Sequence, residues 1–420
     1  MIQADVVKER VNALTLPGLP PGKAVIPDYE GYSICAIPAL IRSLFGEQTK
    51  GADVLVDALD ASWAVPVEKV VLLLIDGIGF YHLLDLLERF PDLALHRLIE
   101  RGTCIPLTSV FPATTATALT TLSTGLTPQE HGMVGYRLYL KEISAITNMV
   151  RLSFLGNSKG DSAIEAGIDL RTFLGAPTLY ERLRRLGVET HVVLSRHIAS
   201  SGLSSLLYDG NAQLHPVVTL SDMLVVTRQI LRRGTARVFI SLYWGATDAI
   251  AHKYGPWTEE FVAELRAVDA AISRELEGKT EEMLFIISSD HGFVQMAKPD
   301  YRQVSDEPEL ARDLLLPPVG EPRASYLFVR EGRKQAVINA IEDRFGGGLV
   351  CLDAGSALDA GLLGQGAIKP EVVDRIGDLL VVSTGRAAIH HPYKDAAMLK
   401  GMHGGLTAHE MLVPFIVSKL

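Results

Sequence analysis

Val70-Val-Leu-Leu-Leu-Ile-Asp76 is an unbroken apolar run that ends on a carboxylate and is followed by Gly-Ile-Gly. A run without polar alternation is typical of a strand that is covered on both faces, as in a parallel sheet. We therefore predict a buried strand here, with Asp76 at its carboxyl end. Because ligands bind beyond the carboxyl ends of the strands in open parallel sheets, Asp76 is also a candidate site residue.

Strand and helix patterns alternate along the rest of the chain, which predicts a large α/β domain. The predicted strands are 104–110, 189–194, 237–243, 283–288, 325–329, 349–352 and 412–417. The predicted helices are 115–124, 180–186, 221–233, 259–276 and 334–345, with helical spacing over 82–101 that breaks at Pro91. Residues 1–60 are predicted to form an N-terminal arm and a lead-in helix, because residues 1–30 are rich in Pro and Gly, which is typical of a surface arm. Residues 61–420 are predicted to form the main domain, with insertions near 136–175 and 295–400 that supply a small cap.

Composition narrows the class of partner. The 420 residues carry a net charge of −9 and no long basic run, which argues against a nucleic-acid polymer as partner. The three cysteines are widely spaced, which indicates a reducing compartment and no disulfide framework. Charged residues precede any apolar run at the N-terminus, and no apolar stretch approaches the roughly 18–20 residues of a membrane span. We expect a soluble, cytoplasmic protein without a membrane partner.

Acidic and imidazole side chains follow several of the predicted strands. Alone, each is more often a turn or cap residue or surface decoration than a ligand, because short motifs have a high false-positive rate. Together, four such segments in one chain favour a metal site, and mixed nitrogen and oxygen ligands suit zinc or a similar divalent ion. The segments are Asp76, Asp248 with His252 four residues later, Asp290-His291, and His403-Gly-Gly405.

Residues 111–125 contain a run of small residues and threonines that begins after Pro112. Thr114 or Thr115 would lie at a helix N-terminus, where free N–H groups and the helix dipole favour negative charge. On its own, such a threonine is more often a capping residue. A threonine hydroxyl becomes a nucleophile only when a base or a metal removes its proton. Metal ligands nearby therefore favour the interpretation as a nucleophile.

These segments, in this order, resemble the alkaline phosphatase superfamily and, within it, the nucleotide pyrophosphatase/phosphodiesterase branch. The resemblance extends from about residue 70 to the C-terminus. It is carried by Leu74-Ile-Asp-Gly77, Phe111-Pro112 with Thr115 and Ser123-Thr-Gly125, Pro128-Gln-Glu-His-Gly132, Thr247-Asp248 with His252 and Gly255-Pro256, Ser289-Asp-His-Gly292, and His403-Gly404. The fold implied is an alkaline-phosphatase-like sandwich, with a mainly parallel central sheet flanked by helices and a small inserted cap.

The resemblance implies two divalent ions, with zinc the first choice and manganese or iron as alternatives. Asp248, His252 and His403 would hold one ion. The other ion would be held by Asp76, Asp290, His291 and the Thr115 oxygen. Thr115 is preferred to Thr114 as nucleophile because, in this branch, the nucleophile lies nine residues before the residue that precedes the glycine of the motif, which is Thr124 here.

One position departs from the branch. Phosphodiesterase members commonly place an asparagine against a phosphate oxygen, and that place falls on Tyr136 here, beside Arg137. Either side chain is a candidate substrate-binding group. The leading prediction is a metal-dependent hydrolase of phosphodiester or pyrophosphate bonds in a small phosphate ester, acting through a phospho-threonine intermediate on Thr115. A phosphomonoesterase or phosphonate hydrolase with the same site ranks second, and a phosphoryl transferase or mutase third. The oligomeric state stays open.

Overall fold

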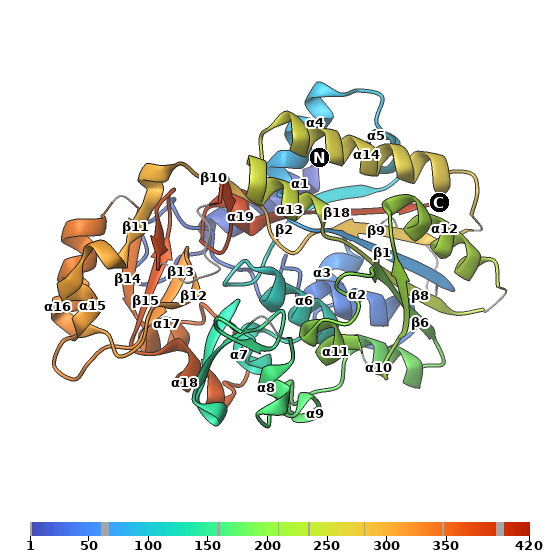
Figure 1. Cartoon of the computed structure of the whole chain (residues 1–420). Helices are drawn as coiled ribbons and strands as arrows, with labels where there is room; N and C mark the ends of the chain where they lie inside the picture. The colour runs from blue at the N-terminus through green and yellow to red at the C-terminus, as the bar shows by residue number, and fades with distance from the viewer. Residues whose placement is uncertain are drawn as a thin grey trace.

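The predicted strand at Val70 is β1 (Lys69–Ile75), which lies near the centre of a seven-stranded sheet (Figure 1). The sheet order is β2-β18-β9-β1-β8-β6-β7. β1 pairs in parallel with β8 and β9, whereas β18 runs antiparallel to β2 and β9. The prediction of a large, mainly parallel sheet is confirmed. The other strands are β2 (Thr103–Thr108), β6 (Glu189–Ser195), β7 (Gln213–Val217), β8 (Val238–Trp244), β9 (Leu284–Ser288) and β18 (Leu412–Lys419).

The structure is a computed structural model that describes residues 2–59, 67–157, 160–208, 210–233, 236–280, 282–346, 348–391 and 399–420. Within these ranges, helices cover both faces of the main sheet (Figure 1). One face carries α4 (Phe80–Arg89), α5 (Ala94–Glu100), α12 (Leu220–Leu231), α13 (Ala246–Tyr254) and α14 (Glu259–Glu275). The other face carries α2 (Ala36–Leu44), α6 (Thr115–Thr124), α10 (Leu179–Arg185) and α11 (Gly202–Tyr208).

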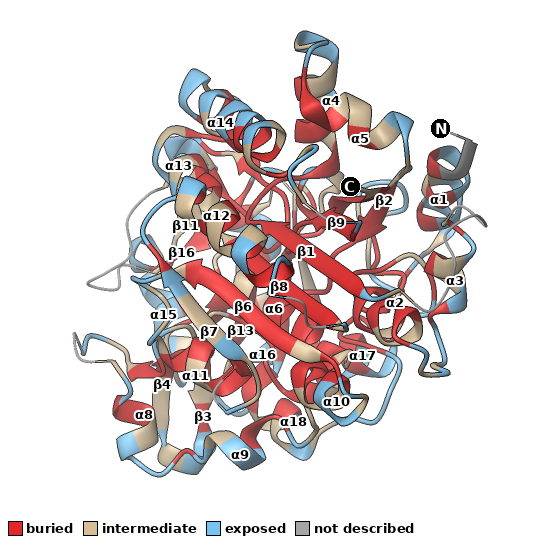
Figure 2. Ribbon diagram, turned by 90° about the vertical axis from the view of Figure 1, so that its right-hand side faces the viewer, coloured by how far each residue is buried: buried red, intermediate tan, exposed pale blue. Residues whose placement is uncertain are grey.

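The unbroken apolar run of β1 supplies both hydrophobic cores. Successive side chains of a strand point to opposite faces. Val71, Leu73 and Ile75 accordingly pack in the core beneath α12 and α14, and the even-numbered residues of β1 pack in the core beneath α2 and α6. Figure 2 shows β1, β8 and β6 buried along nearly their whole length. The sequence pattern without alternation therefore has a direct physical cause, which is that neither face of β1 meets water.

A second seven-stranded sheet, with the order β14-β15-β13-β12-β3-β4-β5, lies beside the first. Its strands pair antiparallel, and they come from the two segments that were predicted as insertions. Gly320 of β12 pairs with Arg137 of β3, so segments about 180 residues apart join here. The strands are β3 (Arg137–Leu140), β4 (Ala145–Asn148), β5 (Ser153–Phe154), β12 (Val319–Glu321), β13 (Ala324–Leu327), β14 (Leu349–Asp353) and β15 (Leu379–Ser383).

The N-terminal segment is packed against the body of the protein. It contains α1 (Ile2–Ala13), α2 and α3 (Asp53–Val56). Val7, Val11 and Ile34 are almost fully buried within the same core as α6. The description of residues 1–30 as a surface arm, which rested on their Pro and Gly content, therefore needs correction. The predicted boundary between residues 60 and 61 lies outside the described residues. Among those that are described, no helix has both the length and the apolar character needed to cross a membrane.

Candidate active site and metal centre

Three neighbouring strands deliver the acidic and imidazole groups to one edge of the main sheet. Asp76 directly follows β1, and Asp290 and His291 follow β9. α13 begins just after β8 and carries Asp248 and His252 on the same face, one helical turn apart. Because β9, β1 and β8 are adjacent and parallel, their carboxyl ends meet at the same place. The predicted convergence of these segments is thus a consequence of the strand order.

Asp248, His252 and His403 form the first group of candidate ligands. Their ligand atoms lie within 4.8 Å of one another. The Nε2 atom of His252 is 3.3 Å from Asp248 Oδ1, and the Nε2 atom of His403 is 3.9 Å from the same oxygen. Two imidazoles and a carboxylate are a common donor set for zinc and similar ions. The structure brings together the three residues that the resemblance assigned to one ion.

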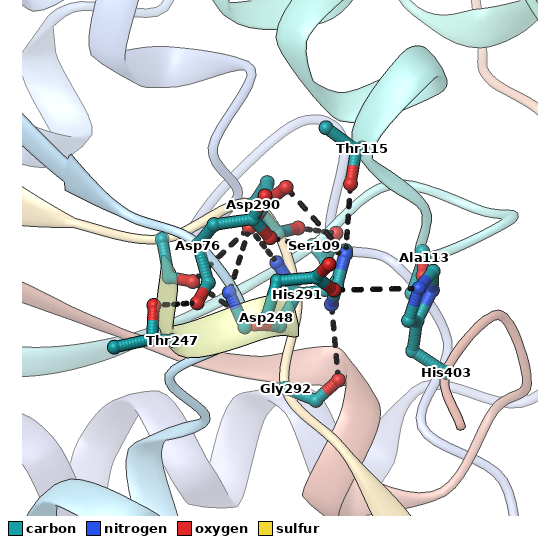
Figure 3. Close-up of polar contacts among 12 residues, drawn as sticks. Asp76, Ser109, Ala113, Thr115, Thr247, Asp248, Asp290, His291, Gly292 and His403 are labelled. Atoms are coloured by element: carbon teal, nitrogen blue, oxygen red, sulfur yellow. Dashed lines mark hydrogen bonds and ion pairs between the residues drawn. The ribbon is translucent and has the colours of Figure 1, made fainter. Parts of the chain in front are cut away.

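The second group surrounds the Nε2 atom of His291, as Figure 3 shows. This nitrogen lies 3.5 Å from Asp76 Oδ1, 3.5 Å from Asp290 Oδ2 and 3.2 Å from the hydroxyl oxygen of Thr115. Asp76 and His291 also lie within 4.8 Å of an Asp248 oxygen, so Asp248 belongs to both groups. The resemblance assigned Asp248 to one ion alone. In the structure it lies between the two groups.

Each of the three imidazoles is oriented by a backbone carbonyl. The Nδ1 atoms of His252, His291 and His403 lie 2.9, 3.1 and 3.0 Å from the carbonyl oxygens of Gly401, Gly292 and Ala113. A neutral imidazole that donates from Nδ1 presents the lone pair of Nε2 to the site, and such hydrogen bonds are typical of metal-ligating histidines. All three rings therefore offer the correct nitrogen to a cation.

Several carboxylate oxygens of the site have no hydrogen-bond partner among the described residues. Asp76 Oδ1, Asp248 Oδ1 and Asp290 Oδ2 are buried and accept no hydrogen bond from any described residue. Burial, together with the charges of Asp290 and Asp248, raises the pKa of Asp76 well above its usual range. Burial alone would raise the pKa of Asp248 as well, but the nearby His252 and His403 outweigh it and lower that pKa. Buried carboxylates are normally paired or bound to metal, so this donor set fits divalent ions.

Thr115 is the first residue of α6 and lies at the edge of the second group. Thr114 has an extended backbone and occupies the N-cap position. The hydroxyl of Thr115 therefore lies beside the first backbone N–H groups of the helix, which have no partner within the helix and favour an anion. The structure places the Thr115 hydroxyl, and not only the helix end, against His291 (Figure 3).

A cavity of about 410 Å³ opens over this site. Its walls include Thr115, Asp248 and the two predicted substrate-binding residues, Tyr136 and Arg137. The guanidinium carbon of Arg137 lies 5.0 Å from the centre of the Tyr136 ring. The cavity thus has the Thr115 hydroxyl at one wall and a cationic side chain at another.

Tyr243 and Glu321 also line this cavity, and neither was predicted from the sequence as a site residue. Tyr243, at the end of β8, donates a hydrogen bond from its phenol to Asp76 Oδ2. Glu321, at the end of β12, is 6% exposed and burial raises its pKa to about 7, against which Thr114 and Arg137 act. Tyr243 had a sequence signal, because it ends a predicted strand of the site edge. Glu321 had none, because it lies in an insertion without a motif.

Comparison with known proteins decides the family. The sequence model of the family "Type I phosphodiesterase / nucleotide pyrophosphatase" matches residues 70–406, which is most of the chain. The chain belongs to this family. Type I phosphodiesterases and nucleotide pyrophosphatases are metal-dependent enzymes that hydrolyse phosphoric esters, and the two ligand groups described above lie within the matched residues. A comparison with curated proteins finds no match.

Solved structures agree with the family fold at low sequence identity. Murine ectonucleotide pyrophosphatase/phosphodiesterase 5 superposes with a TM-score of 0.64 and 17% identity over 83% of this chain and 87% of that chain. Human ectonucleotide pyrophosphatase/phosphodiesterase 5 gives the same values. Phosphonoacetate hydrolase from Sinorhizobium meliloti 1021, in complex with phosphonoacetate, has a TM-score of 0.61 and 22% identity over 84% of this chain and 91% of that chain. These similarities establish a shared fold.

Proposed function

We propose that this protein hydrolyses phosphodiester or pyrophosphate bonds in small molecules with two bound divalent ions and a phospho-threonine intermediate on Thr115. The observation that carries the proposal is the convergence of Asp, His and Thr side chains from five segments around the Thr115 hydroxyl. Family membership supports the reaction class. A cytoplasmic location remains a prediction.

The donor sets suggest how the ions would be shared. Asp248, His252 and His403 would hold one ion. Asp76, His291 and Asp290 would hold the other, with Asp248 close to both. Imidazole and carboxylate donors favour zinc, with manganese or iron as alternatives. Bound ions would lower the pKa of the Thr115 hydroxyl and offset the charge that develops on the entering and leaving oxygens.

The side chains of the protein account for the remaining steps. Thr115 attacks phosphorus in line with the leaving oxygen, and the first substituent departs with the proton as the alcohol or phosphate product. The phospho-threonine keeps the second substituent of the substrate. Water then displaces this substituted phosphoryl group as a phosphate monoester and restores the hydroxyl. The N-terminal amides of α6 lie where negative charge accumulates, and amides fixed in this way need no reorganisation during the reaction. Tyr136 and Arg137 would contact the phosphate or its substituent from the opposite wall.

The charge balance of the metal-loaded site favours a diester substrate over a monoester. Asp76, Asp248, Asp290 and an ionised Thr115 bring four negative charges, which two divalent ions balance. A diester adds about one negative charge and a monoester adds about two near neutral pH. Arg137 on the cavity wall is the specific observation in favour of the second candidate, a monoester or phosphonate substrate. Among the structural neighbours, an inactive variant of the murine enzyme was solved with AMP, and the bacterial hydrolase with phosphonoacetate.

An assay of the metal-loaded protein on bis-p-nitrophenyl phosphate and p-nitrophenyl phosphate tests the proposal. We expect a higher kcat/KM on the diester. Thr115→Ala should abolish turnover on both, whereas Thr115→Ser, which keeps a hydroxyl, should retain part of it. Both variants should melt at the wild-type temperature. A higher kcat/KM on the monoester would instead favour the second candidate, and an active Thr115→Ala variant would assign the nucleophile to another residue.

A further inference from the structure

The hairpin between β12 and β13 reaches into the catalytic cavity from the second sheet. Glu321 and Ala324 are directly opposed at its end, so its tip consists of Pro322 and Arg323. Glu321 and Pro322 both line the cavity. The hairpin is fixed on its other side, since the carbonyl of Pro322 accepts a hydrogen bond of 2.7 Å from the Ile389 N–H. Glu321 therefore projects from a rigid support.

The carboxyl of Glu321 joins two segments that are both part of the proposed reaction site. Its Oε1 atom accepts a hydrogen bond of 2.9 Å from the backbone N–H of Tyr136. The hydroxyl of Thr114, the residue before the proposed nucleophile, lies close enough to the same carboxyl to counteract the rise in its pKa. One buried side chain thus holds the start of α6 and the segment that carries Tyr136 and Arg137.

Backbone contacts around Glu321 are equally close. A Cβ atom on Gly135 would lie 3.1 Å from the Cα of Gly320, so the strand before Glu321 lies directly against the segment before Tyr136. On the opposite side, a Cβ on Gly404 would lie 3.0 Å from the Cβ of Glu321. Gly404 follows His403, so Glu321 also touches the loop that carries a candidate metal ligand. Three segments of the site meet at this one side chain.

We propose that Glu321 is a positioning residue, which holds Thr115 and the Tyr136–Arg137 segment in register across the cavity. The inference rests on the proposed function, because it assigns to Thr115 the role of nucleophile. Glu321 acts through its neighbours and needs no contact with the reacting atoms. Glu321 is 6% exposed, which suits this role because water cannot compete for the hydrogen bonds of a buried side chain.

The chemistry of the contact predicts which substitutions are tolerated. Glutamine keeps one acceptor oxygen for the Tyr136 N–H, and its amide can donate to the Thr114 hydroxyl, which is able to accept. Alanine removes the hydrogen bond to the Tyr136 N–H and the contact with the Thr114 hydroxyl. Aspartate keeps the charge but is one methylene shorter, so it cannot reach both partners from the same backbone position. Length and hydrogen-bonding capacity, and not charge, should therefore decide activity.

The experiment compares Glu321→Ala, Glu321→Gln and Glu321→Asp in the full metal-loaded chain. The matched control is Glu331→Ala, in an exposed turn that follows β13. Turnover of bis-p-nitrophenyl phosphate, amide hydrogen exchange and metal content are measured. A displacement of about 1 Å at a reacting group costs on the order of 10²-fold in rate, so we expect a fall of about that size in kcat for Glu321→Ala and Glu321→Asp. Their metal content should stay at the wild-type level, and exchange should accelerate over residues 113–118 and 135–138. Glu321→Gln and Glu331→Ala should behave like the wild type.

Two results would overturn the positioning role. One is a wild-type kcat for Glu321→Ala, at any rate of amide hydrogen exchange. The other is a Glu321→Gln variant that is as slow as Glu321→Ala while its exchange stays at the wild-type level, which would show that the charge matters. A wild-type protein without turnover would refute the proposed function instead. The exchange measurement would then still decide whether Glu321 holds the two segments.

Discussion

The buried ion pair between Arg323 and Glu410 links the second sheet to the loop that carries His403. Arg323 Nε lies 2.6 Å from Glu410 Oε1 and Arg323 Nη2 lies 2.7 Å from Oε2, and neither side chain is exposed. Glu410 also accepts a 2.8 Å hydrogen bond from the Gly405 N–H. Arg323→Met removes the positive charge of a fully buried, bidentate pair and leaves the Glu410 carboxylate without its partner. Such a loss costs about 3–5 kcal/mol.

Urea unfolding of the metal-loaded protein measures this change in the free energy of unfolding. The matched control is Arg333→Met, because Arg333 forms a similar bidentate pair with Asp313 at 2.8 and 3.0 Å on the surface. Exposed pairs contribute little, so the control should unfold close to the wild-type midpoint. We also expect the Arg323 variant to bind less metal, since the His403 loop loses its anchor. Equal effects of the two substitutions, or a loss below about 1 kcal/mol for Arg323→Met, would refute this reasoning.

Three further predictions concern the metal groups and the buried carboxyl in the cavity. Asp248→Asn should reduce metal content, measured by elemental analysis, more than Asp290→Asn, because Asp248 lies in both ligand groups; equal losses would argue against its shared role. Chelation should lower the melting temperature, since ions at 100 times their dissociation constant stabilise the folded state by about 2.7 kcal/mol, and an unchanged temperature would contradict the metal centre. Burial raises the pKa of Glu321 from 4.5 to about 7. Between these pH values Glu321 is ionised in the unfolded chain but protonated in the folded protein, so the free energy of unfolding falls as pH rises. At about 1.4 kcal/mol per pKa unit, Glu321→Gln should be more stable than the wild type by roughly 3 kcal/mol at pH 8 and equally stable near pH 4. A difference in the free energy of unfolding that does not depend on pH would count against a buried acid at this position.

The main sheet and the convergence of the candidate metal ligands could be predicted because local sequence determines them. The apolar run of β1 shows burial on both faces, and the residue that follows such a strand lies at the ligand-binding edge. The helix predicted at Thr115–Thr124 has those bounds in the structure, since Pro112 precedes it and Gly125 ends it in the left-handed conformation. His252 could be placed with Asp248 because one helical turn separates them.

The second sheet and its contribution to the site could not be predicted in the same way. β3 and β12 have four and three residues, too few for a periodic pattern, and they pair across a long stretch of chain. The position of Glu321 depends on that pairing, and so does the bond between Arg323 and Glu410. The Pro and Gly residues near the N-terminus suggested an exposed segment, whereas Val7 and Val11 of α1 enter the core. Long-range packing decided each of these features.

The identity of the nucleophile can be tested by trapping the intermediate. Metal-loaded protein is mixed with bis-p-nitrophenyl phosphate, quenched in acid during turnover, digested and analysed by peptide mass spectrometry. We predict a p-nitrophenyl phosphoryl ester on Thr115, because only one of the two p-nitrophenyl groups leaves in the first step. Turnover without any phosphorylated peptide, or with the phosphoryl group on another residue, would contradict it.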